Sequence, residues 1–158
     1  MRFIVILALH VALFASSYNF DEYKFVKAVS TEFKNSGHID VQKDKTVIVY
    51  SEPSYKKIVK TDTNVTIEDS SKKLYHLKGR ANFYAKTFIG AMTRLGDFSK
   101  LKGSSDFDIQ KDGNTYFVAF KGDLADQITK AEVYVKDSKV LNFKMFMPNG
   151  DTIKIVKK

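Results

Sequence analysis

The side chains that most often carry catalysis are scarce in this sequence of 158 residues. Cysteine is absent, and His38 and His76 are the only histidines after the first seventeen residues. Two histidines without a third ligand at metal spacing do not predict a metal site. Asp106 and Asp108 would share one face of a strand, but such pairs are far more often solvated than used for acid–base work. With no nucleophile elbow and no phosphate-binding glycine loop, the sequence predicts a non-enzyme without metal or cofactor.

One short motif indicates a modification. Asn64 is followed by Val65 and Thr66, and Asp62 stands two positions before it. Asparagine in Asn-x-Thr is a glycosylation acceptor, and the preceding acid resembles the extended motif of bacterial oligosaccharyltransferases. Asn64 is therefore a candidate glycosylation site.

The charge balance is basic, with 26 Lys and Arg against 18 Asp and Glu and a net charge of +8. The only arginines are Arg2, Arg80 and Arg94, whereas the reading of bases relies strongly on bidentate arginine. The lysines are spread along the chain rather than gathered in one cluster. These features disfavour nucleic acid as a partner and leave open an anionic membrane surface or an acidic protein.

The first seventeen residues have the layout of a secretory signal: Arg2, an apolar run from Phe3 to Ala15, then small residues. That run is shorter than the roughly twenty residues of a bilayer span, although an uncleaved anchor is the alternative. Cleavage after Ala15 or Ser17 fits this layout, and with residues 1–17 assigned to the signal a single domain remains, residues 18–158. Because exported domains often rely on disulfides and this one has none, we expect the bacterial periplasm and a fold held by its core.

Short alternating runs separated by turns predict an antiparallel meander from His38 onward. Asn149-Gly150 is the strongest hairpin signal. On the later strands the apolar residues share one face, whereas 46–51 and 114–121 are apolar on both faces, so we expect a second layer over these two runs. The strands are predicted at 38–43, 46–51, 55–61, 64–69, 72–77, 105–111, 114–121, 130–137, 140–147 and 151–158.

Two segments depart from this alternation. Residues 83–98 repeat large apolar side chains at helical spacing, which predicts an amphipathic helix followed by a loop at 99–105. Residues 21–33 also show helical spacing, with acids in the first turn, and predict a short helix; a strand from Phe25 to Phe33 is the alternative. The stripe of the first helix consists of Tyr84, Phe88, Ile89, Met92 and Leu95.

The order of these parts resembles the LolA-type periplasmic lipoprotein carriers. Four segments carry the likeness, which extends from Gly37 to Ile155. Lys43 stands where the family has a functional arginine, and the family's basic-Pro pair is absent because Asp44 follows. The segments are Gly37–Lys43, a strand that runs from glycine to a basic residue; Tyr50–Pro53, an aromatic-x-x-Pro step; Lys60–Ile67, a turn and strand; and Phe143–Ile155, a closing hairpin.

The resemblance implies an α+β fold, a strongly curved antiparallel sheet that forms an unclosed half-barrel with helices covering its concave face. It also implies a monomeric carrier that takes lipoproteins or related lipids from an inner-membrane donor to an outer-membrane acceptor, with Lys43 as a partner contact. The lipid-binding residues would be Tyr84, Phe88, Ile89, Met92, Leu95, Val133, Val135, Phe143, Met145, Ile153 and Ile155.

Two other function classes stay open. A structural or interaction module of the cell envelope would have a packed core and no cargo. An envelope hydrolase would need Asp106, Asp108 and His76 to cluster in space.

Overall fold

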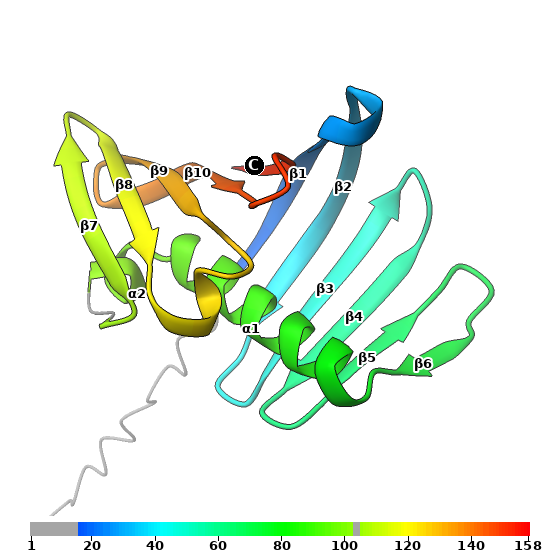
Figure 1. Ribbon diagram of the computed structural model, residues 1–158. Helices are drawn as coiled ribbons and strands as arrows, with labels where there is room; N and C mark the ends of the chain where they lie inside the picture. Colours follow the sequence, from blue (N-terminus) through cyan, green and yellow to red (C-terminus); the bar gives the residue numbers. More distant parts are fainter. Residues whose placement is uncertain (1–15, 103–104) are drawn as a thin grey trace, which may run out of the picture.

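The computed structural model describes residues 16–102 and 105–158, and within them eleven strands form one sheet. The strand order is β6-β5-β4-β3-β2-β1-β11-β10-β9-β8-β7, and every neighbouring pair is antiparallel. From β1, the middle strand of the sheet, the chain runs outward to β6, crosses the sheet as helix α1, and returns from β7. Figure 1 shows the sheet bent around α1. Because β6 and β7 are edges that do not meet, the predicted unclosed half-barrel is confirmed.

All ten strand predictions are confirmed, with bounds that differ by a few residues. The exception is β2, which begins earlier than predicted. The strands of the first half are β1 (Ser16–Val26), β2 (Thr31–Val41), β3 (Lys45–Glu52), β4 (Lys56–Thr61), β5 (Val65–Glu68) and β6 (Leu74–His76). The remaining elements are η1 (Lys27–Val29), α1 (Gly79–Leu95), α2 (Phe98–Lys102), β7 (Phe107–Asp112), β8 (Thr115–Phe120), η2 (Gly122–Leu124), β9 (Lys130–Lys136), β10 (Lys139–Phe146) and β11 (Thr152–Lys157).

The predicted helix over residues 21–33 is wrong, because this segment is the β1–β2 hairpin. The two strands pair along their whole length, from Ser16 opposite Val41 to Val26 opposite Thr31. The two acids at its start do not cap a helix. Both lie on β1 and are buried, and cross-strand pairing outweighs the helical spacing of the apolar residues.

The predicted loop at 99–105 is also partly wrong, since residues 98–102 form α2. Asp97 explains the helix, because its carboxylate accepts a hydrogen bond from the backbone N–H of Ser99 at 3.0 Å, as an N-cap residue does. The short helix buries Leu101 against the core.

One face of the sheet carries most of the core. Phe143 lies opposite Val133 on β9 and opposite Ile155 on β11, and all three are buried. In the first half of the chain, an isoleucine row crosses four neighbouring strands on the same face. The row consists of Ile39, Ile48, Ile58 and Ile67, which are paired in register from β2 to β5.

The outer face is less covered than the sequence suggested. Phe117 on β8 is 41% exposed and Ala119 beside it is exposed, so the expected second layer over 114–121 is absent from the described residues. On β3 the outward Val47 and Val49 are half-buried. The apolar outer face of β8 is therefore free surface.

The predicted signal segment falls largely outside the described residues, which begin at Ser16. Ser16 and Ser17 already belong to β1, where they pair with Val41 and Asp40. Neither α1 nor α2 has the length and hydropathy that a membrane-spanning helix requires, in the part of the chain that the structure describes.

Candidate functional site

The inner face of the sheet is covered by α1, which crosses it from the β4–β5 side to the β1–β10 side (Figure 1). Its inward side chains are buried around Ala91 and Leu95, neither of which is exposed at all. The segment around η2 lies on the same side and adds Leu124 and Ile128 to this core. We call α1 the lid and the sheet surface beneath it the inner face.

The structure brings together ten of the eleven residues predicted to bind lipid. On the sheet, Val133, Val135, Phe143, Met145 and Ile155 are buried and Ile153 is half-buried. On the lid, Ile89, Met92 and Leu95 are buried, and Phe88 packs partly buried against them. Tyr84 is 43% exposed and is not part of this cluster.

Sequence reasoning missed the isoleucine row as part of the same surface. Ile39 and Ile48 are buried, while Ile58 and Ile67 are half-buried and pack against the core. The signal was present, because each occupies an inward position of an alternating strand. The inner face thus extends over both halves of the sheet.

The C-terminal end of the lid is held by charged side chains. Arg94 Nη1 lies 2.6 Å from Asp106 Oδ2, and its guanidinium stands 4.9 Å from the ring centroid of Phe107. Lys157 Nζ, from β11, donates a hydrogen bond to the carbonyl oxygen of Gly96, where a cation complements the helix dipole. This end therefore has ties to β7 and to β11.

Tyr18 lies under the same end of the lid, with Lys157 Nζ 4.2 Å from its ring centroid. Its hydroxyl is so near Gly96 that an added Cβ there would stand 2.7 Å from it. Burial raises the pKa of Tyr18 to about 12, and the charge of Asp97 adds to the shift. Burial lowers the pKa of Lys157, against the opposing charge of Asp97.

The N-terminal end of the lid is held by side-chain hydrogen bonds to backbone atoms of the β4–β5 turn. The Asn82 side chain donates to the carbonyl oxygen of Thr63 and accepts from the backbone N–H of Val65, both at 2.8 Å. Lys86 Nζ donates to the carbonyl oxygen of Asp62 at 3.0 Å. On this end Phe83 and Tyr84 are each 43% exposed.

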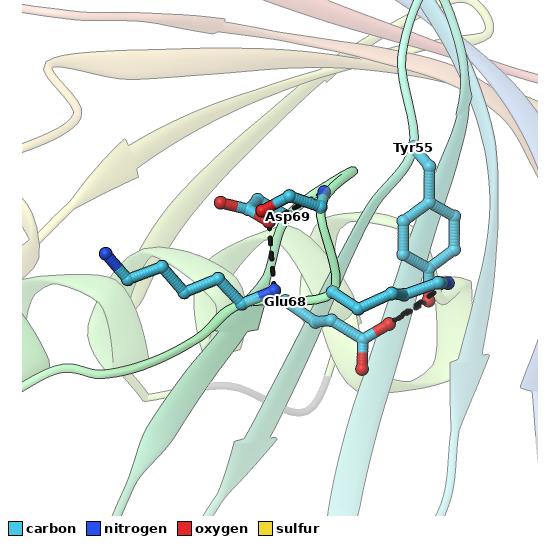
Figure 2. A network of polar contacts seen from close by, with 6 residues as sticks. Tyr55, Glu68 and Asp69 are labelled. Atoms are coloured by element: carbon cyan, nitrogen blue, oxygen red, sulfur yellow. Dashed lines mark hydrogen bonds and ion pairs between the residues drawn. The ribbon is translucent and has the colours of Figure 1, made fainter.

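A polar network fixes the β5–β6 hairpin, from which the chain enters the lid. Figure 2 shows the Tyr55 hydroxyl directed at the Glu68 carboxylate, a hydrogen bond of 2.7 Å that lowers the pKa of Glu68. Lys72 Nζ is 3.4 Å from the same carboxylate oxygen. Asp69 accepts from the backbone N–H of Lys73, which closes the turn. Each of these groups is thus paired with a neighbour in the hairpin.

A hollow of about 640 Å³ opens at the C-terminal end of the lid. It is open to solvent and is lined by the α1–α2 junction, the β9–β10 turn and the ends of β1 and β11. Apolar and basic side chains line it together, with Phe98 and Leu141 facing the same space as Lys139 and Lys157. This hollow is thus separate from the inner face beneath the lid.

A buried carboxylate lies on the inner face beyond the lid. Glu22 stands opposite Ile155 and accepts hydrogen bonds from Asn35 Nδ2 at 2.7 Å and from the Tyr50 hydroxyl at 2.8 Å. Burial, with the nearby charge of Glu22, raises the pKa of Tyr50. The inner face therefore has a polar end near the β1–β2 hairpin.

The residues considered for catalysis do not come together. His76 is on β6 and Asp106 precedes β7, which are opposite edges of the sheet. Asp108 pairs with Lys121 at 2.9 Å and Asp106 with Arg94. No group of three metal-ligating side chains exists among the residues that the structure describes.

The two remaining predicted sites both lie in exposed turns. Lys43 is exposed between β2 and β3. Asn64 is exposed between β4 and β5, and its backbone N–H donates to Thr61 Oγ1. Both positions are accessible, and their roles stay predictions.

Comparison with known proteins gives structural likenesses alone. No protein-family model and no curated protein matches the sequence. The chain is similar to a DUF1329 family protein from Desulfovibrio piger, with 10% identity and a TM-score of 0.46 over 91% of this chain and 83% of that one. It is also similar to a domain from Vibrio parahaemolyticus provisionally named as an outer membrane lipoprotein-sorting protein domain, with 8% identity and a TM-score of 0.43 over the same shares. At such identities, function must be argued from this chain's own residues.

Proposed function

We propose that this chain is an exported, non-enzymatic carrier that holds the acyl chains of lipoproteins or related lipids between its inner face and its lid. The observation that carries the proposal is the lid itself. A single helix covers an apolar surface that spans both halves of an open sheet, and side-chain contacts fasten it at its two ends. A helix that is fastened by side-chain contacts can move away from the sheet without breaking hydrogen bonds between the strands.

The chemistry of the covered surface suits acyl chains. Each methylene removed from water contributes about 0.8 kcal/mol, so a long chain gains much from such a surface. Met92 and Phe88 on the lid and Met145 on the sheet belong to one apolar cluster, and methionine repacks easily around different shapes. A ligand could therefore replace part of this packing when the lid lifts.

The place and partners in this proposal follow the LolA-type resemblance. The chain would work in the periplasm and take its cargo from an inner-membrane donor to an outer-membrane acceptor. Binding and release would need no nucleotide and no covalent step. Lys43 would contribute to partner contact, though it lacks the planar donor fork of an arginine.

One observation favours the alternative, a packed envelope module without cargo. Val133, Phe143 and Met145 are completely buried with the lid in place, as in an ordinary protein core. The two functions therefore differ in whether the lid can leave this surface.

The deciding experiment is mass spectrometry of lipid or lipoprotein that co-purifies from the periplasm, followed by titration with a fluorescent acyl probe. A carrier should release a reproducible acylated ligand and should bind the probe when emptied. Phe88→Asp, on the half-buried inner side of the lid, should weaken probe binding about tenfold or more. Tyr84→Asp is the matched control, one turn earlier and exposed, and should bind as the wild type does.

A protein that is always empty, ignores the probe and does not solubilise a lipoprotein would be the packed module instead. Equal probe binding by the Phe88 and Tyr84 variants would move the binding surface away from the lid.

A further inference from the structure

The β1–β2 hairpin projects beyond β3 (Figure 1), whereas on its other side β1 pairs with β11 as far as Phe25. Pairing of β2 with β3 begins only at Ser36, so residues 31–35 have β1 as their sole neighbouring strand. At about 3.3 Å per residue, this overhang is about 16 Å long. Residues 27–34 are all exposed. We call residues 27–34, the end of this hairpin, the tip.

The tip presents apolar side chains to water in a fixed conformation. Val29 is 60% exposed and Phe33 is 50% exposed. The turn is held by the backbone N–H of Ser30 donating to the carbonyl oxygen of Lys27, and by Thr31 Oγ1 donating to that of Val29. A further bond joins the backbone N–H of Lys27 to Asp151 Oδ1 at 2.9 Å. Exposure of these apolar groups is thus built into the fold and is not a frayed end.

Basic side chains surround the apolar ones. Lys24, Lys27 and Lys34 are exposed in and beside the tip. The acids near them are the exposed Glu32, Asp21, whose carboxylate lies 3.5 Å from Lys34 Nζ, and Asp151, which accepts from the backbone N–H of Lys27. Lysine can lay its aliphatic stem along an apolar surface while its ammonium group stays at a polar boundary. Apolar groups at the end of a projection with basic groups behind them fit the surface of an anionic bilayer.

The side of the hairpin that carries Phe33 continues into the inner face. Phe33 pairs with Lys24 on β1, Lys24 with Ile153 on β11, and Ile153 with Met145 on β10. Residues paired in this way share one face of the sheet. A bilayer into which Phe33 inserts would therefore lie beside the end of the inner face that is nearest to the tip.

We propose that the tip, through Val29 and Phe33 with Lys24, Lys27 and Lys34, docks the protein on an anionic lipid bilayer by shallow insertion of its apolar side chains. The inference goes beyond the carrier proposal, because docking requires neither a cargo nor movement of the lid.

The test is flotation with vesicles of phosphatidylcholine alone or of phosphatidylcholine with phosphatidylglycerol. The protein is purified from the cell envelope, with its N-terminal form fixed by mass and identical in all variants. The double variant Val29→Asp/Phe33→Asp should bind anionic vesicles about tenfold or more weakly than the wild type. The matched control Leu74→Asp/Phe117→Asp places the same charges at two exposed apolar positions elsewhere and should bind like the wild type.

A second experiment measures how much the basic side chains contribute to vesicle binding. Exchange of Lys24, Lys27 and Lys34 for glutamine should weaken binding to anionic vesicles and reduce its dependence on salt. Wild-type protein that floats with neither vesicle would overturn the inference, even if the tip captured a protein. So would equal loss in the tip and control variants, or binding by the tip double variant that matches the wild type. Folded variants are expected throughout, because all substituted side chains are exposed.

Discussion

The two ends of the lid differ in burial and in fastening. From Ile89 to Leu95 the inward side chains are buried at 6% exposure or less, and Arg94 and Lys157 join this end to two strands. Toward the N-terminus, Phe83 and Tyr84 are nearly half exposed, and Asn82 and Lys86 bond to backbone atoms of one turn. The same helix is therefore a core element at one end and a cover at the other.

The difference predicts where the molecule opens. Segments with few buried apolar contacts open locally at a lower free energy than the core does. The N-terminal end of the lid should therefore lift first, over the isoleucine row on β4 and β5, while the C-terminal end acts as the hinge. Substitutions at each end of the lid test this difference separately.

The largest contrast should come from placing a carboxylate at each end. Met92→Asp would bury a charge at a position that is 5% exposed, which should lower the free energy of unfolding by about 4 kcal/mol or more and leave little folded protein. Phe88→Asp, at a half-buried position one turn earlier, should stay folded. Circular dichroism and urea unfolding measure both variants.

Equal destabilisation by the two variants would contradict the division of the lid. Unfolding by Phe88→Asp would mean that the core extends to the N-terminal end, and it would also favour the packed module over the carrier.

Tyr18, beneath the C-terminal end of the lid, should make the free energy of unfolding depend on alkaline pH. The phenol of Tyr18 ionises near pH 10 in the unfolded chain and near pH 12 in the folded protein. Between these values the folded state binds more protons than the unfolded state, so the free energy of unfolding falls as the pH rises. Tyr18→Phe should remove this part of the fall, a difference of about 2 kcal/mol at pH 12.

The measurement is urea unfolding of both proteins between pH 9 and pH 12. Because Tyr50 also has a raised pKa, some alkaline loss should persist in Tyr18→Phe. If the free energy of unfolding fell equally with pH in the variant and the wild type, the phenol of Tyr18 would be solvated and the lid would not cover it.

Most of the sheet could be predicted from the sequence, because alternation of apolar and polar residues determines which face of a strand is buried. The exception is residues 21–33, where apolar residues at helical spacing lie in a hairpin. Their pairing from Ser16–Val41 to Val26–Thr31 is a tertiary contact that local spacing does not reveal. Asp21 indicates the same, since its buried carboxylate pairs with Lys158 at the end of the neighbouring strand β11 rather than with a helix terminus.

The candidate site was predictable where large side chains repeat and not where geometry decides. Phe143 and Met145 are buried on the inner face, as the alternation along this strand predicts, whereas Tyr84 is exposed because the helix reaches the edge of the core at this turn. Ala91 is completely buried but too small to mark a stripe. The tip was invisible in sequence, since its projection depends on how far β3 extends beside β2.

The smallest effect should come from loosening the N-terminal end. Asn82→Ala removes two hydrogen bonds to the β4–β5 turn, each with a net contribution of about 1 kcal/mol. The opening equilibrium of this end should therefore rise about tenfold or more. Hydrogen exchange should speed up at amides of residues 83–88 and stay unchanged at residues 91–95, because Arg94 and Lys157 still hold the hinge. Uniform acceleration along the whole of α1 would mean that the helix opens as one unit. If acyl chains enter under this end, the same variant should also exchange a fluorescent acyl probe faster than Asn149→Ala, which alters an asparagine in the distant β10–β11 turn.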